Sequence, residues 1–203
     1  SAPRPCGNFA PPWARIDGQA GTLDRHFSAV QVVLPADHVI RPLQAFERSV
    51  LAAVEEASLH STLVVFGIRP AHPATGFGYI EAGELCAEVR QTPIYRVRRF
   101  VEKPSLARAQ EFLFQGSFFW NAGIFVWRTE AICRALESHL PDARAAFSRP
   151  RAPAELAKVY AGLRQVSIDV AVLERAPNVR MVPVDYFWSD VGSWEALAAV
   201  LPK

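Results

Sequence analysis

The stretch QVVLPADH, residues 31–38, decides how the chain can fold. An apolar run from Val30 to Leu34 stops at Pro35, and Asp37 follows two residues later. A continuous β-branched run of this length predicts a strand that is buried on both faces of a parallel sheet. Ligands of open α/β sheets bind beyond the carboxyl ends of such strands, where an aspartate is suited to hold a divalent metal. A cap for the next helix explains Asp37 as well.

The segments after this stretch alternate between helical and strand patterns. Apolar residues at helical spacing predict a helix that opens at Pro42 and extends to Ala57, and the β-branched run at 62–68 predicts a second buried strand. Strand, helix and strand in this order form a βαβ unit, which makes the fold class α/β. We also expect strands at 94–101 and 179–184, and helices at 105–113, 129–138, 153–163, 167–174 and 193–201.

Composition and length are those of one globular domain. Of the 203 residues 50% are hydrophobic and 21% charged, and the net charge is +2, so neither nucleic acid nor a membrane is an expected partner. The cysteines lack metal-ligand spacing and no apolar run is long enough to span a membrane, which together favour the cytoplasm. Residues 1–28 are poorly patterned, and we assign the domain to 29–203. The oligomeric state stays open, a homo-oligomer included.

Two acids share one setting in the sequence. Asp190, like Asp37, comes directly after an apolar segment and ahead of a predicted helix. Carboxylates at equivalent strand-to-helix positions could meet at one metal. We then expect them within about 8 Å of each other, because each must reach a Mg²⁺ ion at about 2.1 Å, directly or through water.

Other polar residues interrupt or end apolar segments. Glu102 and Lys103 follow a predicted strand; neighbours on a strand point to opposite faces, and a solvated pair beside a turn explains them. Asn121 interrupts the most hydrophobic segment, so its amide must bond to backbone or to a ligand hydroxyl. Asp169 suits the first turn of a helix, where the dipole favours an acid. Gly78 ends a Gly-x-Gly that favours a turn or the close approach of a ligand.

Six stretches, in chain order, are similar to motifs of one enzyme family: LPADHVI, FGIRPAHPATGFGYI, RFVEKP, FFWNAGIFVW, SIDVAVLE and FWSDVGSW. They extend from about Val30 to Leu201. The chain therefore resembles the sugar-1-phosphate nucleotidyltransferases, and most closely the mannose-1-phosphate guanylyltransferases among them. The resemblance implies a Rossmann-like nucleotide-diphospho-sugar transferase fold with a mixed, mainly parallel sheet.

The resemblance also implies roles for the candidate residues. Asp37 and Asp190 would hold Mg²⁺ and act in catalysis. Lys103 would act with them by binding the sugar phosphate. The sugar itself would be bound by the remaining candidates, which are Gly78 through its backbone, Glu102, Asn121 and Asp169.

The implied reaction forms GDP-mannose and pyrophosphate from GTP and mannose 1-phosphate. A phosphate oxygen of mannose 1-phosphate attacks the α-phosphorus of GTP, and needs no general base because a phosphomonoester has its second pKa at about 6. Mg²⁺ and Lys103 would relieve the repulsion between the two anions. Two alternatives stay open: a relative that only binds a sugar phosphate or nucleotide sugar, and a nucleotidyltransferase for another sugar 1-phosphate.

One feature of the family is not found in the sequence. Its Gly-rich nucleotide-binding loop follows the first strand, whereas the glycines at 18–23 follow no predicted strand and precede no basic pair. We therefore expect a chain that begins after the first βαβ unit of the fold, with an exposed sheet edge. We also expect little catalysis from the chain alone, because the N–H groups that cradle the triphosphate would be missing.

Overall fold

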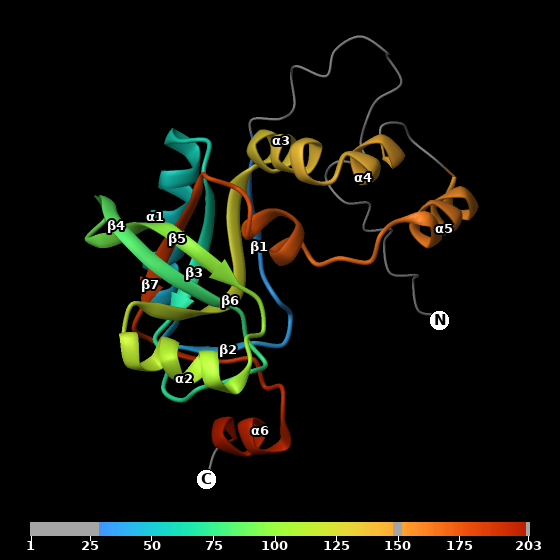
Figure 1. Ribbon diagram of the computed structural model, residues 1–203. Coiled ribbons are helices and arrows are strands. Elements are labelled where there is room, and N and C mark those ends of the chain that lie inside the picture. Colours follow the sequence, from blue (N-terminus) through green and yellow to red (C-terminus); the bar gives the residue numbers. More distant parts are fainter. Residues whose placement is uncertain (1–28, 148–151, 202–203) are drawn as a thin grey trace, which may run out of the picture.

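The computed structural model (Figure 1) describes residues 29–147 and 152–201. The predicted segment 1–28, with the glycines at 18–23, lies outside the described residues. The strands are β1 (Val30–Val33), β2 (Val39–Arg41), β3 (Leu63–Ile68), β4 (Tyr79–Val89), β5 (Thr92–Val101), β6 (Phe118–Arg128), β7 (Val179–Val184) and β8 (Phe187–Ser189). The helices are α1 (Leu43–Leu59), α2 (Leu106–Gln115), α3 (Thr129–His139), α4 (Pro141–Ala146), α5 (Pro153–Gly162), the π-helical turn η2 (Asp169–Leu173) and α6 (Trp194–Val200). The predicted elements are present, with a π-helical turn in place of the helix expected at 167–174. By contrast β2, β6, β8, α4 and most of β4 have no counterpart among them.

Six strands form one mixed sheet in the order β1-β6-β3-β7-β5-β4, with a further pairing of β4 to β6. The predicted α/β class and mixed sheet are confirmed, but the expectation of a mainly parallel sheet is wrong. Only β3 and β7 pair in parallel among the described strands, and the other pairings are antiparallel. One reason is β5, which runs against β4 and β7, and another is β6, which lies between β1 and β3 and runs against both. The two strands of the βαβ unit are therefore parallel to each other without being neighbours.

Strand β1 is not the doubly buried strand that its sequence predicts. Val32 is 39% exposed and Val33 41%, because β1 lies at the end of the strand order and pairs with β6 alone among the described strands. Strand β3 has a similar β-branched run and is buried along its whole length. The contrast follows from position in the sheet, since an edge strand has a neighbour on one side only.

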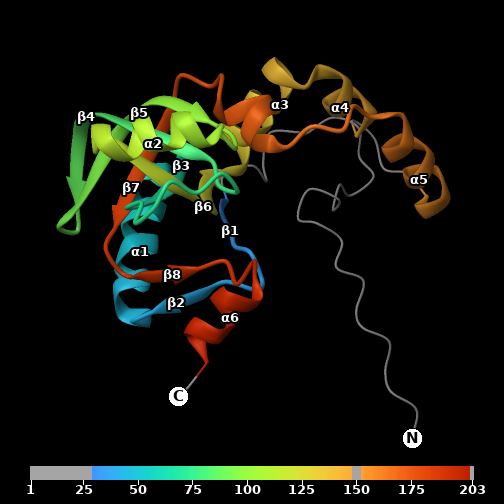
Figure 2. The same ribbon diagram turned by 60° about the horizontal axis from the view of Figure 1, so that its bottom comes forward.

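Helices cover both faces of the sheet and divide the core in two (Figures 1 and 2). On one face, Ala53 of α1 and Val64 and Phe66 of β3 belong to one core cluster, in which Phe112 of α2 stacks on Phe118 of β6. On the other face, α3 and η2 pack against Leu63 and other alternating residues of β3. This alternation is the period of two that a strand imposes on its side chains. Within the described residues, no helix is both long enough and apolar enough to cross a membrane.

Strands β2 and β8 form a separate antiparallel ribbon beside α6 (Figure 2). Val39 lies opposite Ser189, and Arg41 lies opposite Phe187. The guanidinium of Arg41 also donates to the backbone oxygen of Val200 in α6, at 3.2 Å. The ribbon therefore joins two motifs that stand about 150 residues apart, LPADHVI and FWSDVGSW.

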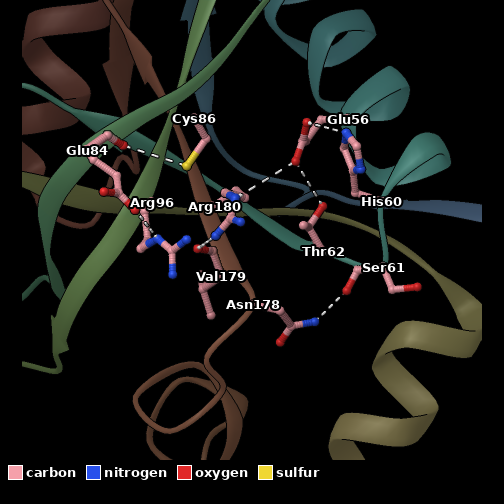
Figure 3. A network of polar contacts seen from close by, with 10 residues as sticks. All are labelled: Glu56, His60, Ser61, Thr62, Glu84, Cys86, Arg96, Asn178, Val179 and Arg180. Atoms are coloured by element: carbon pink, nitrogen blue, oxygen red, sulfur yellow. Dashed lines mark hydrogen bonds and ion pairs between the residues drawn. The ribbon is translucent and has the colours of Figure 1, made fainter.

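A buried acid ties α1 to the sheet where β3 and β7 begin (Figure 3). The side chain of Glu56 is 4% exposed, and Arg180 Nε lies 4.0 Å from its Oε1. Thr62 donates to the same oxygen at 3.5 Å, and His60 Nε2 lies 3.8 Å from Oε2. Because removing one partner of a buried charge leaves the other uncompensated, this network holds α1 against the sheet.

Candidate active site

Five of the predicted site residues lie together, and we name them the Lys103 cluster: Gly78, Glu102, Lys103, Asn121 and Asp169. Glu102 and Lys103 directly follow β5, and Lys103 Nζ lies 2.5 Å from Glu102 Oε1. The expectation that their side chains point to opposite faces is therefore wrong. The chain leaves strand geometry here, because Lys103 has a φ of +43°, a left-handed conformation uncommon outside glycine. Its hydrogen bond to Glu102 raises the pKa of Lys103, which keeps the amine charged.

Gly78 makes room for the carboxylate of Glu102. A Cβ added to Gly78 would lie 2.5 Å from Glu102 Oε2 and 3.3 Å from the Phe100 ring. The carbonyl oxygen of Gly78 accepts a hydrogen bond from the backbone N–H of Asn121, at 2.8 Å. A glycine at this position therefore lets the acid approach the backbone, which any other residue would prevent.

Asn121 and Asp169 complete the cluster. Asn121 Nδ2 donates to Asp169 Oδ1 at 3.1 Å, and its Oδ1 accepts from the N–H of Gly123 at 3.1 Å. Burial raises the pKa of Asp169, and the negative charge of Glu102 raises it further. The second effect requires the two carboxylates to be near each other. The cluster thus offers two acids, one amide and one amine on a small area, a set suited to bind a polyhydroxylated anion.

The two acids Asp37 and Asp190, which we name the ribbon acids, lie near one imidazole. Burial lowers the pKa of His38, against the opposing effect of Asp37 and Asp190. Trp188 Nε1 donates to His38 Nδ1 at 3.2 Å, so this nitrogen carries no proton. The predicted setting of Asp37 is wrong in one respect, because it lies between β1 and β2 and not ahead of a helix. The pairing of β2 with β8 is what brings the ribbon acids to His38.

The ribbon acids lack a positive partner within residues 29–147 and 152–201. No ion pair there includes either of them, and Asp190 Oδ1 accepts only a backbone N–H, that of Gly192, at 3.2 Å. In the same part of the chain, no group of three or more His, Cys, Asp or Glu side chains is placed to hold a metal. Two uncompensated carboxylates fit Mg²⁺, which takes one or two protein carboxylates and fills its shell with water and phosphate oxygens. That the ribbon acids share Mg²⁺ stays a prediction.

Strand β6 connects the two groups of residues. Gly123 has a φ of +67°, and a Cβ there would lie 3.7 Å from Pro35 Cγ and 3.9 Å from His38 Cε1. Two residues earlier, Asn121 belongs to the Lys103 cluster. The loop 35–38, which carries Asp37, and the Lys103 cluster therefore both lie next to one short stretch of β6, where a single elongated ligand could contact both.

Comparison with known proteins identifies the family of this site. Residues 10–203 match the nucleotidyl transferase family model, which is nearly the whole chain. The chain belongs to the nucleotidyl transferase family. The resemblance to the sugar-1-phosphate nucleotidyltransferases is thereby confirmed.

Individual relatives of the chain include a mannose-1-phosphate guanylyltransferase and a xanthan biosynthesis protein. It is 36% identical to a mannose-1-phosphate guanylyltransferase of Sinorhizobium fredii, with 83% of the chain and 34% of the relative covered. It is 40% identical to the xanthan biosynthesis protein XanB of Xanthomonas campestris pv. campestris, covering 83% of the chain and 36% of the relative. A crystal structure from Thermus thermophilus, described as mannose-1-phosphate geranyltransferase, aligns with a TM-score of 0.75 and 38% identity over 84% of this chain and 49% of that one. The chain spans about a third of the length of the two curated relatives.

Three further residues contact the candidate site without having been predicted from sequence. His38 and Trp188 hold the ribbon together, and their adjacency to the ribbon acids in LPADHVI and FWSDVGSW was the available signal. Glu174 Oε1 accepts a hydrogen bond from the backbone N–H of Glu102, at 3.1 Å. Its signal was weaker, because an α-helix would turn Glu174 away from Asp169.

Proposed function

We propose that this member of the nucleotidyl transferase family forms GDP-mannose and pyrophosphate from GTP and mannose 1-phosphate. The observation that carries the proposal is the arrangement around Asn121 and Gly123. Near Asn121, the Lys103 cluster offers acceptors for hydroxyls beside a charged amine. Near Gly123, the loop 35–38 carries Asp37, and the ribbon acids offer oxygen ligands that have no cationic partner in the described part of the chain. The names of the relatives from Sinorhizobium fredii and Thermus thermophilus support a mannose 1-phosphate substrate.

Each residue then has a task that its surroundings allow. Glu102 and Asp169 accept hydrogen bonds from sugar hydroxyls, and the amide of Asn121 orients Asp169. The raised pKa of Lys103 keeps its amine protonated, so it can bind the sugar phosphate and lower the repulsion from GTP. The phosphate oxygen forms a bond to the α-phosphorus as the bond to the β-phosphate breaks, which releases pyrophosphate. Mg²⁺ on Asp37 and Asp190 would neutralise phosphate charge during this transfer.

Specificity for the sugar would come from the paired acids. A site built to bond a hydroxyl rejects a sugar that lacks it or directs it elsewhere, because the buried acceptor is then left unpaired. Both acids are part-buried. We therefore expect a clear preference between mannose 1-phosphate and glucose 1-phosphate, which differ in the direction of one hydroxyl.

The test is pyrophosphate release by the purified chain with Mg²⁺. GTP with mannose 1-phosphate should give the highest rate, with glucose 1-phosphate and UTP as the competing substrates. Faster release with glucose 1-phosphate would contradict the mannose assignment. Calorimetric binding of mannose 1-phosphate without pyrophosphate release from any pair would favour a relative that binds a sugar phosphate and does not transfer. If the chain neither binds mannose 1-phosphate nor releases pyrophosphate, both functions are contradicted.

A further inference from the structure

The segment 167–174 contains a π-helical turn where the sequence predicts an α-helix. Its defining bond runs from the backbone N–H of Glu174 to the carbonyl oxygen of Asp169, five residues back, at 2.9 Å. The turn spans Asp169–Leu173, and its Ala171, Val172 and Leu173 are buried against the sheet. Single π-helical turns of this kind are rare and occur often at functional sites.

The wide turn changes which side chains share a side. In an α-helix with 3.6 residues per turn, residues five apart are separated by about 140° around the axis. In a π-helical turn, residue i+5 lies above residue i, as residue i+4 does in an α-helix. Asp169 and Glu174 are five residues apart, and both reach the Lys103 cluster. Asp169 accepts from the Asn121 amide, and Glu174 accepts from the Glu102 backbone N–H.

We propose that Glu174 is a positioning residue for Glu102 and Lys103, and that the π-helical turn lets one short segment supply both Asp169 and Glu174 to the site. The part of this inference that concerns ligand binding rests on the proposed function. Glu174 is exposed, so core packing does not explain where its carboxylate lies.

The backbone that Glu174 anchors needs such support. Lys103 holds a φ of +43°, which costs free energy for a residue with a side chain and persists only where neighbours enforce it. The Glu174 oxygen that accepts the N–H one residue earlier fixes the backbone at this point. With that N–H fixed, the Glu102 carboxylate stays against Gly78, and Lys103 Nζ stays on Glu102.

Three variants of Glu174 distinguish the effects of its acceptor oxygen, its charge and the length of its side chain. E174A removes the acceptor, E174D retracts it by one carbon, and E174Q keeps a neutral oxygen at the same position. E137A is the matched control, since Glu137 is also an exposed acid that accepts from a donor elsewhere, Arg144. Because Glu174 and Glu137 are exposed, we expect all four variants to fold. If E174A fails to fold, E174D and E174Q still decide whether Glu174 positions Glu102.

Amide hydrogen exchange at Glu102 is the first measurement and needs no ligand. We expect faster exchange in E174A and E174D, and near-native exchange in E174Q and E137A. Native exchange at Glu102 in E174A and E174D would overturn the positioning role. The side-chain amide oxygen in E174Q can replace the carboxylate as acceptor. Exchange at Glu102 that is as fast in E174Q as in E174A would therefore also overturn the positioning role.

Calorimetry with mannose 1-phosphate is the second measurement. We expect E174A and E174D to bind it about three- to tenfold more weakly than the wild type, with E174Q close to the wild type and GTP affinity unchanged in all. Unchanged mannose 1-phosphate affinity in E174A and E174D would overturn the inference while leaving the proposed function intact. If the wild type itself binds no mannose 1-phosphate, the proposed function fails, and the exchange data still decide whether Glu174 anchors Glu102.

Discussion

The Lys103 cluster and the ribbon acids differ in how their charges are balanced. In the cluster, Lys103 pairs with Glu102, and Asp169 is bonded to Asn121. In the ribbon, Asp37 and Asp190 face a neutral imidazole and have no cationic partner in the described part of the chain. From this difference we predict that the cluster is formed before a ligand arrives, whereas the ribbon acids take a cation from solution. Under the proposed function, protein groups would position the sugar, and the ion would bring the charge that the protein omits.

The largest expected effect is the loss of the cluster's cation. K103A should weaken mannose 1-phosphate binding by about 1.5–3 kcal/mol, the range for a hydrogen bond to a charged group, or roughly 10- to 150-fold. R96A is the control, because Arg96 forms an exposed ion pair with Glu84 at 2.7 Å (Figure 3). Calorimetry on both variants measures the effect. Equal affinities in K103A and the wild type would remove Lys103 from the site.

Gly78 gives the second prediction. In G78A the new Cβ would meet Glu102 Oε2, so the carboxylate must swing away from Lys103 and from the sugar. We expect about tenfold weaker mannose 1-phosphate binding with a Tm change below about 2 °C, because only the end of a side chain has to move. G76A should change neither quantity, since a Cβ on Gly76 meets nothing within 4 Å. Native affinity in G78A would show that the position of Glu102 does not matter.

The ribbon acids give the third prediction, and it concerns the ion. Millimolar Mg²⁺ should raise the Tm of the wild type by about 2–4 °C, because an ion that binds only the folded state stabilises it. D37N and D190N should each abolish this increase, and without Mg²⁺ each should be at least as stable as the wild type because a like-charge repulsion is removed. D142N, in the first turn of α4, is the control. If Mg²⁺ raises the Tm of D37N and D190N as much as that of the wild type, the ribbon acids do not bind the ion.

The smallest expected effect is a pH-dependent gain of stability in D169N. The pKa of Asp169 is raised in the folded state, chiefly by burial. Its contribution to stability is therefore fully present below the ordinary pKa of 3.8 and is lost as the pH rises through the raised value. At pH 7 we expect D169N to melt about 1–3 °C above the wild type while binding mannose 1-phosphate more weakly. Thermal melts should show the Tm difference vanish under acid conditions; a difference independent of pH would argue against this origin.

The sequence predicted well what a single segment determines. The helix ending near Ala57 and the strand at 62–68 are present as α1 and β3, because their patterns are long and their burial follows from their own residues. The sequence-based prediction failed where the burial of a segment depends on the strands beside it. Residues 30–34 have the composition of a buried strand, yet the edge position leaves Val32 and Val33 exposed.

In the candidate site, too, the sequence identified individual residues but not the contacts between distant segments. The resemblance singled out residues that the structure does bring together, including Glu102, Asn121 and Asp169. It did not indicate how they meet. β2 and β8 have three residues each, too few for a periodic signal, and yet they bring Asp37 and Asp190 to His38. Local geometry was also hidden, because neither the left-handed turn at Lys103 nor the π-helical turn before Glu174 can be read from side-chain periodicity.

Titration of GDP-mannose into the chain, with Mg²⁺ and with EDTA, tests the division between the two regions most directly. Under the proposed function, the sugar of GDP-mannose binds at the Lys103 cluster and its diphosphate binds through Mg²⁺ at the ribbon acids. We predict tighter binding in Mg²⁺ than in EDTA for the wild type, no Mg²⁺ effect in D190N, and a weakening in K103A that is similar in both buffers. Equal affinity with Mg²⁺ and EDTA in the wild type, or a Mg²⁺ effect that survives in D190N, would contradict the assignment.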